Sequence, residues 1–198
     1  MKKIFFIIFF LTAHNSISEQ KILSIANVNS SIITNIDIGN EIKLLRVLNK
    51  NISLNEDDLK QSALENIIEE ILKNSEIKQK KMDAENKKFI DNRYNKLVQE
   101  IEKKSGLIAQ NLKNKIYQKI KTDHEWNDLI AQKYSWMVSV NMSEIDEKLN
   151  QKKGEYEDQN KFLAEKERLI MTEKNKKLNT YSIMHLEKIK RRSLIKFF

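Results

Sequence analysis

The chain has 198 residues and a formal net charge of +8 at pH 7, with no cysteine, no proline and three glycines. The lack of cysteine excludes disulfides, thiolate metal sites and cysteine nucleophiles, and three scattered glycines cannot build a glycine-rich phosphate loop. Of the 36 basic residues, 31 are lysines, which lack the planar fork that reads phosphates and guanines, so the charge is a weak argument for nucleic acid. The length suits one domain, or a domain with an appendage.

Residues 1–18 have the layout of a secretory signal peptide. Lys2-Lys3 precedes an unbroken apolar run, Ile4–Leu11, and small residues such as Ser16 and Ser18 follow at the expected cleavage site. The run is too short for a membrane span, which needs about 20 residues. We expect an exported protein that begins near Glu19 and keeps no transmembrane anchor. The alternative is a buried apolar element at the N-terminus.

The first elements after residue 19 resemble a hairpin followed by a helix. Ile22–Val28 and Ser31–Ile33 alternate as short strands, and Asn29-Ser30 between them suits a tight turn because Asn tolerates a left-handed backbone. Thr34, with Asp37 three residues on, is close to a capping box with Asp in place of Glu. The helix that follows is predicted to bury a stripe of apolar residues, namely Ile38, Ile42, Leu45 and Leu48.

Two further helices are predicted between residues 54 and 104. Leu54–Gln79 has the clearest periodicity and is predicted to bury one broad apolar face, made of Leu59, Ala63, Ile67 and Ile71 with the flanking Leu64, Ile68 and Leu72. Another helix opens at Asp83 or Ala84 and runs to about Lys104. Its inward positions are expected to be Phe89, Ile90, Tyr94, Leu97, Val98 and Ile101.

The second half of the chain is predicted to hold three more helices and a strand. Ser105-Gly106 separates a helix over about Leu107–Met137, with Thr122-Asp123 as a candidate interruption. Ser143 is the predicted cap of a short helix that buries Ile145 and Leu149. The polar stretch Gly154–Thr180 reads as a long helix that frays near Thr172–Lys177. Ser193–Phe198 is predicted to be a strand whose apolar residues are buried against the first strand. The expected fold is therefore mostly α, with a small β-hairpin completed by a C-terminal strand.

Four segments in chain order resemble the SurA family, periplasmic chaperones of outer-membrane protein assembly. They are Ile22–Leu45, Leu59–Met82, Val138–Gln151 and Tyr181–Phe198. The first resembles the opening strand, turn and helix of that family, and the last its basic C-terminal helix and final strand. Ser30 stands where the family often has Gly. A larger departure is that no parvulin-type prolyl-isomerase module, of about 90 residues, fits between Gln151 and the tail helix.

The resemblance implies a division of the chain and a function. Residues 19–151 would form a SurA N-terminal-like helical chaperone domain, and 152–198 a long helix and strand that pack back on it. The protein would be an ATP-independent periplasmic holdase without isomerase activity. Its partners would be unfolded outer-membrane proteins, with the outer-membrane assembly machinery as a second candidate, and no nucleic acid.

No catalytic, metal or cofactor site is predicted. Only His124 and His185 remain after the signal segment. Asp123-His124-Glu125 cannot converge on one ion because adjacent helix residues point in different directions, so His124 is expected at the surface. His185 is expected to be a partly packed helix residue.

A client-binding surface is the better prospect, because Met and aromatic side chains adapt to many partners. Five such residues lie within residues 126–142: Trp126, Tyr134, Trp136, Met137 and Met142. The competing interpretation is that most of them are core. Two other functions stay open, a Skp-like holdase with coiled-coil arms and a scaffold or anionic-surface binder without clients. A compact lobe whose last strand pairs with the first hairpin would favour SurA, and projecting arms would favour Skp.

Overall fold

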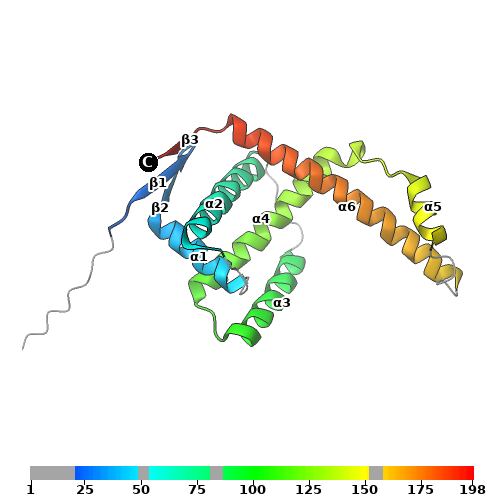
Figure 1. Cartoon of the computed structure of the whole chain (residues 1–198), viewed down its shortest axis with the longest axis horizontal. Coiled ribbons are helices and arrows are strands. Elements are labelled where there is room, and N and C mark those ends of the chain that lie inside the picture. Colours follow the sequence, from blue (N-terminus) through cyan, green and yellow to red (C-terminus); the bar gives the residue numbers. More distant parts are fainter. Residues whose placement is uncertain (1–20, 49–53, 81–86, 152–157) are drawn as a thin grey trace, which may run out of the picture.

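The computed structural model describes residues 21–48, 54–80, 87–151 and 158–198. The chain is mostly helical, as predicted, with a small antiparallel sheet (Figure 1). In order, the elements are β1 (Ser24–Val28), β2 (Ser31–Thr34), α1 (Asn35–Leu48), α2 (Glu56–Gln79), α3 (Lys87–Ser105), α4 (Gln110–Tyr134), the short 3-10 helix η1 (Ser135–Met137), α5 (Met142–Gln151), α6 (Gln159–Arg192) and β3 (Ile195–Phe197). The predicted signal peptide and the predicted start of the third helix lie outside the described residues.

The two ends of the described chain meet in the sheet, whose strand order is β2-β1-β3. β3 pairs antiparallel with β1, with Val28 opposite Ile195 and Ala26 opposite Phe197, so the predicted C-terminal strand is confirmed. Asn29 has φ of 56°, the left-handed turn conformation that its position predicted. The expected burial of the terminal aromatics is wrong. Phe197 is 65% exposed and Phe198 76%, because the three-residue strand anchors the tail mainly through its backbone and Ile195.

The predicted capping box of α1 is confirmed with aspartate in the glutamate position. The Thr34 N–H and hydroxyl both donate to Asp37 Oδ2, at 2.9 and 2.7 Å, and the Asp37 N–H lies 3.3 Å from Thr34 Oγ1. These bonds satisfy amide groups that the first helical turn leaves free. The hairpin therefore passes directly into α1 without a linker.

The main core lies between the sheet, α1 and α2. Its fully buried side chains are Ala26, Val28, Ile33, Ile38, Ile42, Leu59, Ala63, Ile68 and Leu72. The predicted apolar face of α2 is confirmed, but its most buried residues are the flanking Ile68 and Leu72, while Ile67 and Ile71 are only partly buried. Leu48, predicted inward, is exposed.

The opposite face of α1 forms a second core with α3 and α4. Leu44 packs there with Ile90, Val98, Ile101, Ile108, Leu112, Ile116 and Ile120. Phe89 was predicted to face this core but is half exposed, and its ring lies against His124 on α4 at a centroid distance of 5.0 Å. α1 is thus buried on two sides, which explains why both Leu44 and Glu41 are closed from solvent.

α4 starts later and runs more evenly than predicted. It begins at Gln110 rather than near Leu107, and it passes through Thr122-Asp123 without a break. Thr122 is buried and its hydroxyl donates to Asn74 Oδ1 of α2 at 3.0 Å, so this polar pair is a helix-packing contact and not an interruption. Leu107 is 94% exposed, while its neighbour Ile108 turns into the core.

α5 and the first part of α6 project from this body as an arm (Figure 1). The cap of α5 is Asn141 rather than Ser143, since Asn141 Oδ1 accepts from the Ser143 N–H at 3.1 Å, while Ile145 and Leu149 are buried as predicted. α6 is unbroken through Thr172–Lys177, so the predicted fraying is wrong. Its 34 residues give it a length of about 50 Å.

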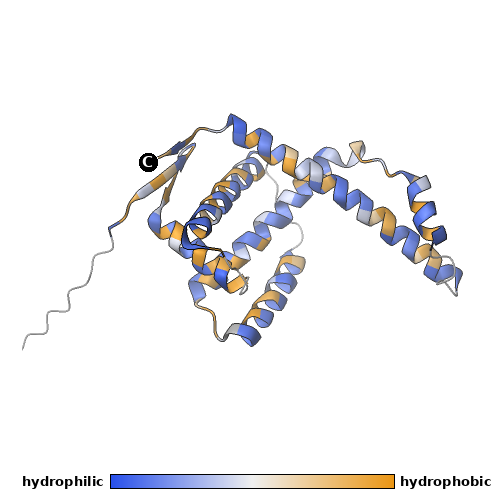
Figure 2. Ribbon diagram, viewed as in Figure 1, coloured by the Kyte–Doolittle hydropathy of each residue, from blue (hydrophilic) through white to orange (hydrophobic). Residues whose placement is uncertain are grey.

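The middle and end of α6 hold the arm to the body. Leu178, Tyr181, Leu186 and Ile189 of α6 pack on a third buried cluster formed by Ile77, Trp126, Leu129 and Ile130. Figure 2 shows apolar and polar residues interleaved along the arm rather than one continuous apolar side. In the part of the chain that the structure describes, no helix combines the length and apolarity that crossing a bilayer requires.

Candidate client-binding surface

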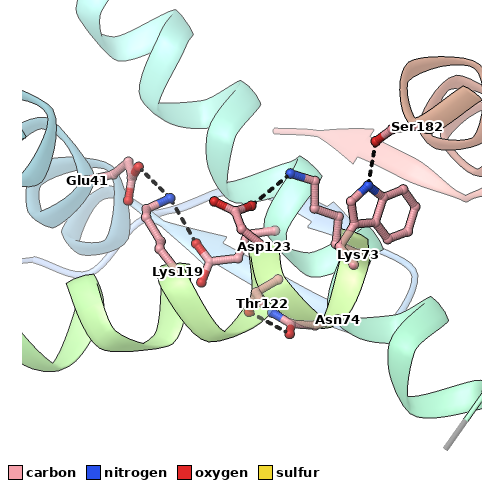
Figure 3. Close-up of polar contacts among 9 residues, drawn as sticks. Glu41, Lys73, Asn74, Lys119, Thr122, Asp123 and Ser182 are labelled. Atoms are coloured by element: carbon pink, nitrogen blue, oxygen red, sulfur yellow. Dashed lines mark hydrogen bonds and ion pairs between the residues drawn. The ribbon is translucent and has the colours of Figure 1, made fainter. Parts of the chain in front are cut away.

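The five predicted client-binding residues divide into a pair packed between α4 and α6, namely buried Trp126 and half-buried Tyr134, and an exposed group. Trp126, on α4, is 2% exposed and its Nε1 donates to Ser182 Oγ of α6 at 2.7 Å. Its indole is therefore part of the joint between α4 and α6 and is closed to a client in this conformation (Figure 3). For Trp126 the core interpretation holds.

Tyr134 lies at the end of α4 and belongs to the same joint. Its ring stacks on Tyr181 of α6 with centroids 5.0 Å apart and planes 4° from parallel. Its hydroxyl lies 2.8 Å from His185 Nδ1. Burial, followed by the charge of Glu76, raises the pKa of the Tyr134 hydroxyl. The ring is half-buried beside α6.

His185 is a core residue rather than the partly packed one that was expected. It is closed from solvent, and its Nε2 lies 3.2 Å from Glu76 Oε1 of α2. A neutral ring with its proton on Nε2 fits both contacts, donating to Glu76 and accepting from the Tyr134 hydroxyl. Burial, followed by the charge of Lys133, lowers the pKa of His185, and the contact with Glu76 offsets only part of this shift. His185 therefore ties together α2, α4 and α6.

The exposed group follows directly after α4. Trp136 is 79% exposed, Met137 44% and Met142 42%. Trp136 is nevertheless fixed in place, since its Nε1 donates to the Lys133 carbonyl at 2.9 Å. We call Trp136, Met137 and Met142 the exposed connector group, because they flank the segment that joins α4 to α5.

The connector is held along the side of α6. Lys177 Nζ donates to the carbonyl of Ser139 in the middle of the segment. Farther along the arm, Lys166 pairs with Asp146 at 2.7 Å and Lys148 with Glu173 at 3.1 Å. Such surface ion pairs contribute little energy, about 0–1 kcal/mol each. The burial of Ile145 and Leu149 is the stronger reason why α5 stays against α6.

A polar seam between α1, α2 and α4 sets the position of α4 (Figure 3). Glu41 of α1 is 1% exposed, and Lys119 Nζ lies 3.0 Å from its Oε1 and 3.1 Å from Glu70 Oε2. The contact with Glu70 is aligned as a hydrogen bond, whereas Glu41 Oε1 receives an ion pair without that alignment. Burial alone would lower the pKa of Lys119, but the charges of Glu70 and Glu41 outweigh it and raise the pKa.

An apolar groove that the sequence did not reveal lies between β1, α1 and α2. Ile25, Ile38, Ile42 and Leu64 line it, and its volume is about 450 Å³. Gly39 lies at its wall, and a Cβ added there would meet nothing within 4 Å. A glycine inside a predicted helix was the one signal available, because it leaves room where every other residue places a side chain. The groove is large enough for one or two apolar side chains of a bound peptide.

Within the described residues, no group of three or more His, Asp or Glu side chains could hold a metal ion. The predicted divergence of Asp123, His124 and Glu125 is confirmed, because Asp123 pairs with Lys73 and Glu125 lies near Lys121. His124 is half-buried rather than a surface residue, with Nε2 3.5 Å from Asp128 Oδ2.

No protein-family model matches this chain, and no curated protein sequence matches it. The features of the described residues that bear on function are an exposed connector with an aromatic side chain and methionines, a projecting arm and an apolar groove in the body.

Proposed function

We propose that this protein is an ATP-independent holdase that binds unfolded outer-membrane proteins in the periplasm. The observation that carries the proposal is the exposed connector group, in which a fixed, 79% exposed tryptophan stands beside two half-exposed methionines. A folded chain normally buries such side chains, and an apolar cluster left in water marks an interaction site.

The chemistry of the connector suits clients of varied sequence. Strands of outer-membrane barrels alternate apolar and polar residues and carry aromatic side chains near the membrane interfaces. A tryptophan offers a large flat contact, while flexible methionine side chains repack against different partners. Binding of this kind is weak and quickly reversible, and it needs no nucleotide to release a client.

The scaffold supports the same function. The arm carries the connector group at its root, and the apolar groove lies on the body near the sheet, so an extended client could contact both. The return of β3 to β1 is the closure that the SurA resemblance implied. The proposal includes that resemblance, the export of the chain and the absence of isomerase activity.

One observation favours the second candidate, a Skp-like holdase. α5 and α6 form a projecting arm, the feature that distinguishes that class. The arm is a short helix laid on a longer one, and the C-terminal half of that longer helix is fixed in the body by Tyr181 and His185. We therefore place the protein nearer to SurA, with client holding common to both candidates.

An aggregation assay tests the proposal. An unfolded outer-membrane β-barrel protein is diluted from urea into buffer without nucleotide, with and without residues 19–198 of this chain, and light scattering is followed. We expect suppression near stoichiometric ratios, and a clear loss of suppression in Trp136→Ala.

Leu107→Ala is the matched control, because Leu107 is the most exposed large apolar residue described and lies beyond the opposite end of α4. The 25 residues of α4 separate the two sites by about 35 Å. Scattering that is unchanged by the wild-type protein would refute the holdase function. Equal losses in the two variants would refute the assignment to the connector.

A further inference from the structure

A polar cavity of about 330 Å³ lies where α6 reaches the sheet. Figure 1 shows α6 passing over the end of α2 at this point. The cavity is lined by Ser75, Glu76 and Gln79 from α2, Lys133 from α4, and Lys188 and Arg192 from α6, with buried His185 at its base. Its size is at the lower end of the range for small-molecule sites, roughly 300–1,000 Å³.

The charges in this cavity are not balanced. Glu76 is its one carboxylate, and Glu76 Oε1 is already shared by Lys133 at 3.8 Å and His185 at 3.2 Å. Among the described residues, neither Lys188 nor Arg192 has an acidic side chain within ion-pair distance. Lys188 and Arg192 therefore face a cavity whose single carboxylate, Glu76, already pairs with Lys133 and His185. This excess of positive charge favours an anionic ligand.

The donors converge from two helices. Lys188 and Arg192 are four residues apart on α6, and Ser75 and Gln79 are four residues apart on α2, so each pair shares one helix face. All four line the same cavity. Arginine presents a planar fork that matches phosphate oxygens, lysine adds a point charge, and the hydroxyl and amide donors suit the remaining oxygens.

We propose that this cavity binds a small phosphomonoester, with Arg192 and Lys188 on the phosphate group. Ser75 and Gln79 donate to it from α2, and Glu76 accepts from a hydroxyl of the group that carries the phosphate. A ligand held in this way bridges α2 and α6, so its binding stabilises the packing of the C-terminal part of α6 on α2. The cavity includes none of the three residues of the exposed connector group, and phosphate binding does not require chaperone activity.

The chain offers a matched control. The last turn of α6 also carries Lys190 and Arg191, which do not line the cavity. Cations near a helix C-terminus stabilise the helix through its dipole wherever they point. Two double variants each remove two positive charges near the C-terminal end of α6, namely Lys188→Gln/Arg192→Gln and Lys190→Gln/Arg191→Gln. Only the first pair lines the cavity, so a difference in phosphate binding between the variants would report the cavity and not the charge alone.

The experiment measures the melting temperature of residues 19–198 in glycerol 3-phosphate and in inorganic phosphate, against sodium chloride at equal ionic strength. We expect both phosphates to raise the melting temperature of wild type and of the Lys190/Arg191 variant, with glycerol 3-phosphate the more effective. The Lys188/Arg192 variant should need at least tenfold more ligand for the same rise. Equal responses of the two variants, or no rise in wild type, would overturn the proposal.

Two further measurements fix the place and the source of the ligand. In carbon–proton spectra of the histidine rings, glycerol 3-phosphate should shift His185 at the base of the cavity and leave His124 unchanged; movement of His124 alone would overturn the site. Sedimentation with phosphatidic acid vesicles tests a lipid source of the same group. Vesicle binding lost only in the Lys188/Arg192 variant assigns the phosphate to a lipid, and vesicle binding equal in both variants assigns it to a free ligand.

Discussion

Asn29 and Leu194, 165 residues apart, exchange two hydrogen bonds. The Asn29 N–H donates to the Leu194 carbonyl at 2.8 Å, and the Leu194 N–H donates to Asn29 Oδ1 at 3.0 Å. The first hairpin turn is thus the point at which the tail of the chain is fastened. The Phe198 N–H donates to the Ile25 carbonyl at 3.0 Å and continues the same ladder.

Asn29→Ala should destabilise the protein by about 1–3 kcal/mol, because it removes a hydrogen-bond acceptor and puts alanine, which tolerates the left-handed region less well than asparagine, at a φ of 56°. Asn29→Gly removes the same acceptor but tolerates the backbone conformation, so its loss should be smaller, about 0.5–1.5 kcal/mol. Urea unfolding of both variants measures the two effects separately. Equal losses would show that the turn conformation carries no strain.

Deleting Ser193–Phe198 should lower the melting temperature and promote aggregation. The deletion uncovers the edge of β1 and removes Ile195, which packs on the main core. Full burial of such a side chain contributes roughly 1.5–3 kcal/mol, and the partly buried Ile195 contributes less than that. Phe198→Ser is the control and should change stability little, because that side chain is mostly exposed. A truncated protein that melts like the full chain would mean that the tail is a separate appendage.

Lys119→Met should lower the free energy of unfolding by about 3–5 kcal/mol, since it leaves the buried Glu41 carboxylate without a counter-charge. The double variant Lys119→Met/Glu41→Gln should recover part of that loss. Lys73→Met is the matched control, because its partner Asp123 is half exposed and such pairs contribute about 0–1 kcal/mol. Thermal and urea denaturation measure the stability of the three variants. A larger loss of stability in Lys73→Met than in Lys119→Met would contradict this prediction.

Acid should loosen the joint between α6 and the body. The pKa of His185 is lowered in the folded protein, mainly by burial and then by Lys133, so the unfolded chain takes up the proton more readily. The neutral ring therefore stabilises the fold fully above the unfolded pKa of about 6.5, and this stabilisation is lost as the pH falls through and below that value. We expect the melting temperature to fall between pH 7.5 and pH 5.5, and His185→Gln to reduce that fall. If the melting temperature of His185→Gln fell by as much as that of wild type, the pH dependence would come from titratable groups other than His185.

The elements that local residue patterns define were predictable from the sequence. Asn29 defines its turn, and Thr34 with Asp37 defines the start of α1, because each acts on its own neighbours along the chain. The type and order of the helices followed from their apolar periodicity. Which residues within the apolar face of α2 are most buried did not follow, since Ile67 and Ile68 are equally apolar and only the sheet and α1 decide between them.

The candidate sites depend on contacts between distant segments. Trp126 and Trp136 are alike in the sequence, but one is enclosed by α6 and the other lies in the connector just beyond α4. The burial of Glu41 and His185 likewise arises from helices that join far along the chain. The apolar periodicity of one helix does not show which distant helix packs on it. The exposure of the connector group can therefore be seen only in the assembled structure.

Site-specific crosslinking to a client decides whether Trp136 lies in a client-binding surface. A photoreactive phenylalanine derivative is placed at Trp136 and, in a second protein, at Leu107, and each is irradiated with an unfolded outer-membrane protein. We expect a crosslinked product from position 136, reduced by excess unlabelled client, and little from position 107, although Leu107 is the more exposed. Crosslinking at position 107 equal to that at position 136, or none at either position, would contradict a client surface at the root of the arm.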